Sequence, residues 1–332
     1  MQNLYYIVSI MIFLIFLNIF THLKMKHSLR YKLLMLMLGF SPILVLAQQD
    51  TRLSMYMFDK MAINPAAAGS KDAMEAGLIS RAQWLDISGA PITNEFMFQA
   101  PFSSKKVGWG VEVMNDQIGP VSSTSIQGNY AYHLRLFSGQ LSMGLGVGLY
   151  DYVIDFSKIT YKDQSDYYNT MTRSQQLVPT AEAGLYYYSQ SFYLGASVNH
   201  LIESRLTNES IADAATFKPH AYIIMGQGFT LSENVLFSPS FAVDLVQGAP
   251  PSGDINIAFL LQQKLWLGVS YRYNYGLVFL AAYRATKSFQ IGYSYDLGLN
   301  AIGMAGGGSH EISLIVDFGG RNKTVQASPR YL

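Results

Sequence analysis

The chain has 332 residues, of which 50% are hydrophobic and 14% are charged, and its formal net charge at pH 7 is +1. This near-neutral balance argues against a nucleic-acid partner, which normally requires a basic surface. With no cysteine, the chain can form neither a disulfide framework nor a thiolate metal site. Its 23 Tyr, 19 Phe and 3 Trp residues favour β-strands and the two interfaces of a membrane.

The N-terminal region predicts export from the cytoplasm. An apolar run at residues 33–46 ends in Val45-Leu46-Ala47, the small-residue pattern of a cleavage site. Four basic residues precede that run: Lys24, Lys26, Arg30 and Lys32. We therefore expect residues 25–47 to be a signal peptide and the mature chain to begin near Gln48. Because this signal is complete in itself, we interpret residues 1–24 as an artefact of the gene start rather than as a membrane anchor.

Residues 48–76 are apolar but show no regular alternation. Their side chains need burial, because apolar surface left in water costs free energy. We expect this segment to pack as a plug inside the fold that the following residues form. Docking onto a periplasmic partner is the alternative interpretation.

Residues 77–318 repeat one pattern, in which about ten residues of alternating apolar and polar character are followed by a turn. A period of two is that of a β-strand and not that of a helix. In the clearest example, Leu141, Met143, Leu145, Val147 and Leu149 alternate with Ser142, Gly144, Gly146, Gly148 and Tyr150. Beyond residue 48 there is no apolar run of about 18 residues that could span a bilayer as a helix.

This alternation predicts an all-β fold, a transmembrane antiparallel β-barrel of about fourteen strands. The predicted strands are 77–84, 92–101, 106–115, 123–136, 140–152, 180–189, 191–201, 219–231, 235–246, 254–262, 264–273, 276–285, 288–297 and 310–318. A soluble β-sandwich or lipocalin is the alternative, but it would expose a charged face, whereas the polar face here is rich in Gly, Ser, Asn and Tyr.

The connections predict the orientation of the barrel, because outer-membrane barrels have short periplasmic turns and longer outside loops. The short connections, which we place in the periplasm, are 103–105, 137–139, 190, 232–234, 263 and 286–287. The outer connections are 85–91, 116–122, 153–179, 202–218, 247–253, 274–275 and 298–309. All but 274–275 are longer than every short turn. Residues 319–332 then form a periplasmic tail.

Charged residues within the predicted strands share one parity and therefore face the lumen. They are Arg81, Glu95, Glu112, Arg135, Glu182, Asp254, Arg272, Arg284, Asp296, Glu311 and Asp317. The shared parity has a physical cause, since a charge facing lipid near the midplane costs about 2–4 kcal/mol. Two interpretations remain open: a permeation path with a mildly acidic lining, or a salt-bridged network that fills a barrel too narrow to stay open.

The sequence carries no sign of catalysis. The motifs G-x-S-x-G, H-E-x-x-H and the P-loop are absent. The strand histidines His133, His200, His220 and His310 fall on separate strands without metal-ligand spacing. We therefore expect no enzyme activity, no cofactor and no metal.

Three phrases near the first predicted hairpin resemble the PorP/SprF family of outer-membrane proteins from Bacteroidota. They are Tyr56-Met57-Phe58 with Asn64-Pro65 and Gly69, then Arg81-Ala82-Gln83-Trp84, then Gly89-Ala90-Pro91. The chain departs from the family's sequence motif at Asp59-Lys60, where Asn-Pro is usual, and at Ala67, where Tyr is usual.

The resemblance implies a component of the type IX secretion system in the cell outer membrane, supporting export or surface attachment of secreted adhesins and gliding motility. Its partners would be membrane lipid, a secreted adhesin or other cargo, and a periplasmic peptidoglycan-binding lipoprotein. Cargo would meet the long outer loops, where the aromatic residues Tyr161, Tyr167 and Tyr168 are candidate contacts. The alternative function is a FadL-like transporter of hydrophobic small molecules.

Overall fold

The computed structural model describes residues 51–71, 73–162, 172–202, 204–205, 216–246 and 249–318. All of them belong to the compact unit Val45–Leu332. Residues 1–24, the predicted signal peptide at 25–47, the tail at 319–332, and Tyr167 and Tyr168 lie outside the described residues.

Alternating sequence segments form long antiparallel strands. Their bounds are β1 (Met74–Ala82), β2 (Ile92–Pro101), β3 (Val107–Ile118), β4 (Val121–Leu136), β5 (Gly139–Asp155), β6 (Arg173–Tyr188), β7 (Phe192–Asn199), β10 (His220–Gln227), β11 (Phe229–Ser232), β12 (Val235–Val246), β13 (Ser252–Leu261), β14 (Leu265–Arg272), β15 (Gly276–Arg284), β16 (Phe289–Gly298) and β17 (Ser309–Phe318). The short strands β8 (Ser204–Arg205) and β9 (Thr216–Phe217) pair with each other.

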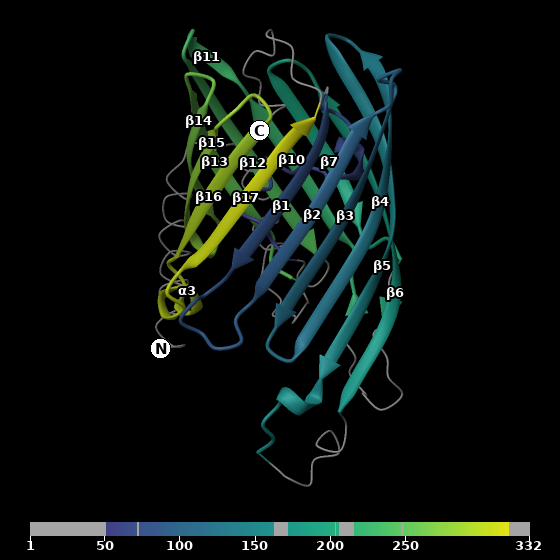
Figure 1. Ribbon diagram of the computed structural model, residues 1–332, viewed down its shortest axis with the longest axis vertical. Helices are drawn as coiled ribbons and strands as arrows, with labels where there is room; N and C mark the ends of the chain where they lie inside the picture. The colour runs from purple at the N-terminus through teal and green to yellow at the C-terminus, as the bar shows by residue number, and fades with distance from the viewer. Residues whose placement is uncertain are drawn as a thin grey trace, which may run out of the picture. The chain divides into compact units, whose positions relative to one another are not determined.

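The sheet closes on itself (Figure 1). From β1 to β7 and from β11 to β17 each strand pairs with the next one in the chain, β1 pairs with β17, and β10 pairs with both β7 and β12. Since β10 and β11 are one strand interrupted at Gly228, the described residues form a closed antiparallel barrel of fourteen strands. The predicted fold class is therefore confirmed.

Burial alternates along the strands as the period of two requires. On β5, Ser142 is 0% exposed whereas Val147 is 68% exposed. Outward positions around the barrel carry large apolar side chains such as Leu78, Phe96 and Ile257. Hydrophobic residues outside and polar residues inside reverse the arrangement of a soluble protein, and this reversal is what a lipid environment favours.

The two ends of the barrel differ in their connections. Turns at 102–106, 137–138, 189–191, 233–234, 262–264 and 285–288 make up the short-turn end. Connections at 83–91, 156–172, 200–219, 247–251 and 299–308 lie at the long-loop end, together with the short turns at 119–120 and 273–275. There β5 and β6 extend past their neighbours (Figure 1).

Some predicted boundaries were wrong. The predicted outer loop 116–122 is a two-residue turn, because Gly119 adopts a φ of +55° and lets β4 start at Val121. The loop predicted at 153–179 shrinks to 156–172, since polar ends of β5 and β6 pair beyond the alternating region. In addition, β1 begins at Met74 rather than at residue 77.

Within the described part of the chain, three short helical segments interrupt the β-structure: η1 (Pro65–Ala67), η2 (Phe156–Lys158) and α3 (Ala301–Ala305). The sequence did not predict α3, which lies in the connection between β16 and β17 and whose first turn is capped by the Asn300 side chain. No helix among the described residues is long and apolar enough to cross a membrane.

Candidate functional site: the filled lumen

Residues 51–71, which we call the lumen segment, lie inside the barrel and contact the inward faces of strands around its circumference. Most of their apolar side chains, including Met55 and Met61, are buried, and Ile63 is partly buried. Hydrogen bonds join Ser54 to Asp296 on β16 and Gly69 to Gln99 on β2. Between these ends Asn64 donates to Leu185 O on β6, which lies seven strands from β16 around the fourteen-strand ring, so the segment crosses the lumen from one side to the opposite side.

The middle of the lumen segment is the helical turn η1, which packs closely on the wall. The Asn64 side chain accepts from Ala66 N at 2.9 Å and donates to Leu185 O on β6 at 3.0 Å. The wall admits this turn because Gly144 on β5 has no side chain: a Cβ there would stand 2.2 Å from Ala66 N. Small residues on both partners permit this backbone approach.

The end of the lumen segment is held by a second close approach. Gly69 has a φ of +63°, and a Cβ added to it would stand 2.5 Å from the Cα of Gly108 on β3. Nearby, Lys71 donates to Glu75 at 2.6 Å and to Phe58 O at 2.9 Å. These contacts fix the turn that leads from the lumen segment into β1.

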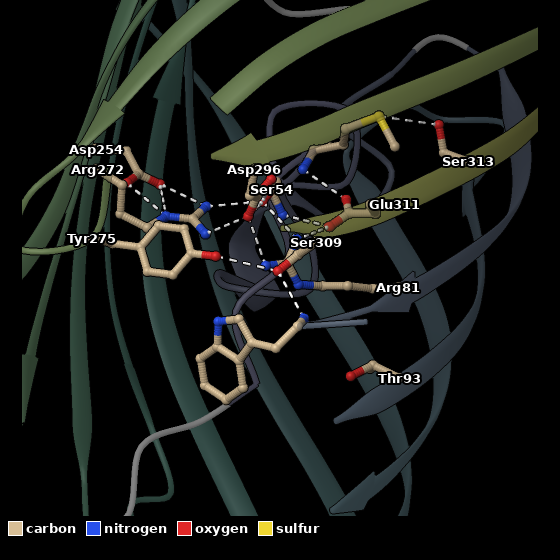
Figure 2. Close-up of polar contacts among 12 residues, drawn as sticks. Ser54, Arg81, Thr93, Asp254, Arg272, Tyr275, Asp296, Ser309, Glu311 and Ser313 are labelled. Atoms are coloured by element: carbon tan, nitrogen blue, oxygen red, sulfur yellow. Dashed lines mark hydrogen bonds and ion pairs between the residues drawn. The ribbon is translucent and has the colours of Figure 1, made fainter. Parts of the chain in front are cut away.

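A buried cluster of charges, the arginine cluster, joins the start of the lumen segment to β1, β13, β14, β16 and β17 (Figure 2). It consists of Ser54 and the charged residues Arg52, Arg81, Asp254, Arg272, Asp296 and Glu311; Arg52 is partly exposed and pairs with Asp254 at 3.2 Å. Arg81 pairs with Asp296 at 2.7 Å and with Glu311 at 3.1 Å. Arg272 pairs with Asp254 at 3.0 Å and with Asp296 at 3.1 Å.

Ser54 is the centre of the arginine cluster. Its hydroxyl donates to Asp296 at 2.8 Å and accepts from Arg81 at 2.8 Å and from Arg272 at 3.1 Å. The carboxylate of Glu311 accepts from the backbone N–H groups of Ser54 and Met55 at 2.7 and 2.8 Å. The lumen segment thus supplies hydrogen bonds, from its backbone and from the Ser54 side chain, to charged residues of the wall. Charge-assisted hydrogen bonds of this kind are strong.

A small cavity lies between the wall and the lumen segment. It has a volume of about 50 Å³ and lies between Arg52, Tyr56, Met114, Tyr222 and Asp244. That volume accommodates a few water molecules, given about 10–15 Å³ of such space for each.

Nine of the eleven predicted lumen charges are buried. Arg135 is exposed and Arg284 is partly exposed, because both lie next to turns of the short-turn end. Arg284 donates to Gln290 at 3.2 Å. The remaining acidic residues on the list, Glu95, Glu112, Glu182 and Asp317, are buried on β2, β3, β6 and β17.

Sequence reasoning missed five buried charged residues: Asp59, Lys60, Lys71, Glu75 and Asp116. Glu75 has the parity of Arg81 and could have been found by extending the first strand backwards. Asp59, Lys60 and Lys71 lie in the lumen segment, where no alternation indicates which way a side chain points.

The phrases that resemble the PorP/SprF family occupy two places. Tyr56, Met57, Phe58, Asn64, Pro65 and Gly69 belong to the lumen segment, and Arg81 belongs to the arginine cluster. Gln83, Trp84, Gly89 and Pro91 shape the loop between β1 and β2. In that loop Gln83 N donates to Pro91 O at 2.9 Å and Trp84 N donates to Ser309 Oγ at 3.3 Å. Tyr161 is partly buried beyond β5, at the long-loop end.

The family of the chain follows from a comparison with known families. The model of the type IX secretion system membrane protein PorP/SprF matches residues 45–316, which include the lumen segment and nearly the whole barrel. The chain belongs to the PorP/SprF family. This result and the closed barrel confirm the resemblance inferred from the sequence and place the protein in the outer membrane.

Solved structures with a similar overall course include other outer-membrane barrels. A FadL homologue of Pseudomonas aeruginosa has a TM-score of 0.45 and 10% identity, over 85% of this chain and 97% of its own. Omp33 of Acinetobacter baumannii has a TM-score of 0.43 and 10% identity, over 75% and 99%. The Pseudomonas putida toluene transporter TodX has a TM-score of 0.42 and 12% identity, over 82% and 94%. Among curated proteins, none matches this PorP/SprF chain significantly in sequence.

Proposed function

We propose that this PorP/SprF protein supports type IX secretion as a closed barrel that binds secreted cargo at the cell surface, and that it does not conduct small molecules. One observation carries the proposal: residues 51–71 cross the lumen, with bonds to β16 and β2 at their two ends and to β6, on the opposite side, in their middle. With the lumen of the barrel filled in this way, partners would bind at its two ends.

The long-loop end is the proposed cargo surface. Loops on a rigid scaffold commonly carry recognition, and the connections at 156–172 and 200–219 are the longest between barrel strands. Because β5 and β6 extend past their neighbours, η2 at the start of the first connection lies beyond the ends of the adjacent strands (Figure 1). Of the three tyrosines predicted as contacts for a secreted adhesin, Tyr161 lies within the described residues. If the cargo is a motility adhesin, this contact would link the protein to gliding.

The short-turn end is the proposed surface for a periplasmic lipoprotein. The sequence offered residues 48–76 for this role, but residues 51–71 are largely buried within the barrel. Phe137 instead stands at the tip of the turn between β4 and β5 with 93% of its surface exposed, and Phe102 is 52% exposed in the turn between β2 and β3. Aromatic residues are enriched in interface cores, so these two side chains support a partner at this end.

Transport of hydrophobic small molecules is the competing function. It requires an apolar path through the lumen or the wall. The described inward positions instead carry the arginine cluster and buried carboxylates such as Glu95 and Glu112. Charges in a low-dielectric interior are costly unless paired, and a lining of this kind does not favour a hydrocarbon.

Affinity purification of the tagged protein from cross-linked outer membranes tests the proposal. We expect a large secreted protein and a periplasmic lipoprotein to co-purify. Tyr161→Ala should reduce recovery of the first only, whereas Phe137→Ala should reduce recovery of the second only. Recovery of neither partner, together with uptake of hydrocarbon by reconstituted vesicles, would favour the transporter.

We also propose that residues 25–47 are removed on export and that the mature chain starts near Gln48. N-terminal sequencing of the protein from outer membranes checks this proposal. A mature protein that retains residues 1–24 would contradict both the signal peptide and the interpretation of residues 1–24 as a gene-start artefact.

A further inference from the structure

Three buried carboxylates converge between the lumen segment and the wall. Asp59 belongs to the segment, Glu95 to β2 and Glu112 to β3, and one oxygen of each lies within 4.8 Å of the others. We propose that this acidic triad binds one Ca²⁺ ion, which attaches the lumen segment to the barrel wall. Such a site was not expected from the sequence, because Asp59 lies outside any alternating segment.

Four of the six carboxylate oxygens of the acidic triad have no hydrogen-bond partner among the described residues. Asp59 Oδ2, both carboxylate oxygens of Glu95, and Glu112 Oε1 are buried without a partner among the described residues. Glu95 is 2% exposed. Buried polar atoms in folded proteins nearly always have partners, so four such oxygens on three neighbouring carboxylates indicate a ligand that accepts electron pairs.

The other oxygens of the triad are held in place. Asp59 Oδ1 accepts from Met61 N at 3.1 Å, and Glu112 Oε2 accepts from Asn129 Nδ2 at 2.7 Å. Metal-binding carboxylates typically have this arrangement, in which an outer hydrogen bond orients the group and the remaining oxygen meets the ion. The geometry is thus prepared on two of the three residues.

The charge around the triad also calls for a cation. Three carboxylates close together in a site removed from water repel one another. The nearby cations have other partners: Lys71 pairs with Glu75 at 2.6 Å, and Lys60 donates to Met57 O at 2.8 Å and lies over the Tyr193 ring. A divalent ion would supply positive charge directly between the carboxylates.

The donor set selects the ion. Oxygen ligands alone suit a hard cation. Ca²⁺ binds oxygen at about 2.3–2.6 Å in flexible geometry, so two ligand oxygens on opposite sides lie about 4.6–5.2 Å apart. Mg²⁺ binds oxygen at about 2.0–2.1 Å and retains several waters. The buried triad between the lumen segment and the wall is less suitable for an ion that keeps those waters. Ca²⁺ is therefore the better fit.

The test uses the full mature chain folded in detergent, stripped with a chelator and then dialysed against CaCl₂ or MgCl₂. We expect elemental analysis to find one Ca²⁺ per chain, and the midpoint of thermal unfolding to rise with CaCl₂ concentration, because an ion that binds only the folded state stabilises it. The same concentration of MgCl₂ should give a smaller rise. No retained Ca²⁺, an unchanged midpoint, or an equal effect of Mg²⁺ would overturn the proposal.

Variants locate the site. Glu95→Gln should lose the bound Ca²⁺ and the calcium-dependent rise, yet without metal it should unfold at or above the midpoint of metal-free wild type, since one repelling charge is gone. Asp317→Asn, which alters a buried wall carboxylate outside the triad, is the matched control and should keep the ion. Asp59→Asn provides a second test in the lumen segment. Wild-type calcium content in Glu95→Gln or Asp59→Asn, or its loss in Asp317→Asn, would overturn the assignment.

Discussion

Arg81 of β1 donates to Asp296 of β16 at 2.7 Å inside the barrel, across the intervening strand β17. Both side chains also bond to Ser54 of the lumen segment (Figure 2). One ion pair therefore connects the barrel wall with the segment that fills it, and the stability of the barrel and the seating of the segment should depend on each other.

Replacing Arg81 by Ala should destabilise the protein by about 3–5 kcal/mol, the usual cost of leaving the partners of a buried ion pair uncompensated. Equilibrium unfolding in detergent or lipid vesicles measures this change. Arg284→Ala is the matched control, because Arg284 is partly exposed near the short-turn end, and it should cost at most about 1 kcal/mol. Similar losses for the two variants would contradict the role given to the arginine cluster.

Gly144→Ala should displace the lumen segment while leaving the barrel closed, because the added Cβ would stand 2.2 Å from Ala66 N. Limited proteolysis should then cleave within residues 51–71, whereas heat-modifiable migration on a gel should be retained. Gly128→Ala on β4 is the control: its Cβ would meet only Val147 O, at 4.0 Å. If residues 51–71 resist proteolysis in both variants as they do in wild type, the inferred close approach of η1 to the wall is wrong.

Asn64→Ala removes the cap of η1 and a bond to Leu185 O. A lost cap costs about 0.5–2 kcal/mol, and the loss should appear as local opening, seen as faster hydrogen exchange at residues 64–69. Asn300→Ala removes the corresponding cap of α3, which accepts from Gly303 N at 2.8 Å, and should leave that exchange unchanged. Equal exchange in Asn64→Ala and wild type would count against a cap at this position.

Val147→Arg tests the lipid-facing side of β5. An arginine facing lipid near the midplane costs about 2–4 kcal/mol and near an interface only about 0–1 kcal/mol. Val147 lies in the middle of β5, and Ile118 ends β3 beside the Gly119 turn. In lipid vesicles, Val147→Arg should therefore cost clearly more unfolding free energy than Ile118→Arg. An equal loss of unfolding free energy in the two variants would argue against placing Val147 near the midplane of the membrane and Ile118 near its interface.

The alternation of residues was enough to predict most of the barrel. The bounds of β2 and β12 agree with the prediction because a period of two is enforced wherever one face meets lipid and the other meets the lumen. At the rims this constraint ends, which is why β5 and β6 run further than expected and why the Gly119 turn was mistaken for a loop.

The contents of the lumen could be predicted only in part. Parity identified Arg81, Asp296 and Glu311 as inward charges, but their common partner Ser54 comes from a segment distant in sequence and without periodicity. Asp59 was missed for the same reason. Contacts of this kind depend on how the segment is threaded through the closed barrel, which local sequence patterns do not encode.

Electrical recording from the wild-type protein in planar lipid bilayers tests the central claim most directly. With the lumen filled by residues 51–71, we expect no stable open-channel steps in wild type, and steps should appear when residues 51–70 are deleted. Ohmic conductance of wild type equal to that of the deletion variant would contradict a closed barrel and favour a permeation path.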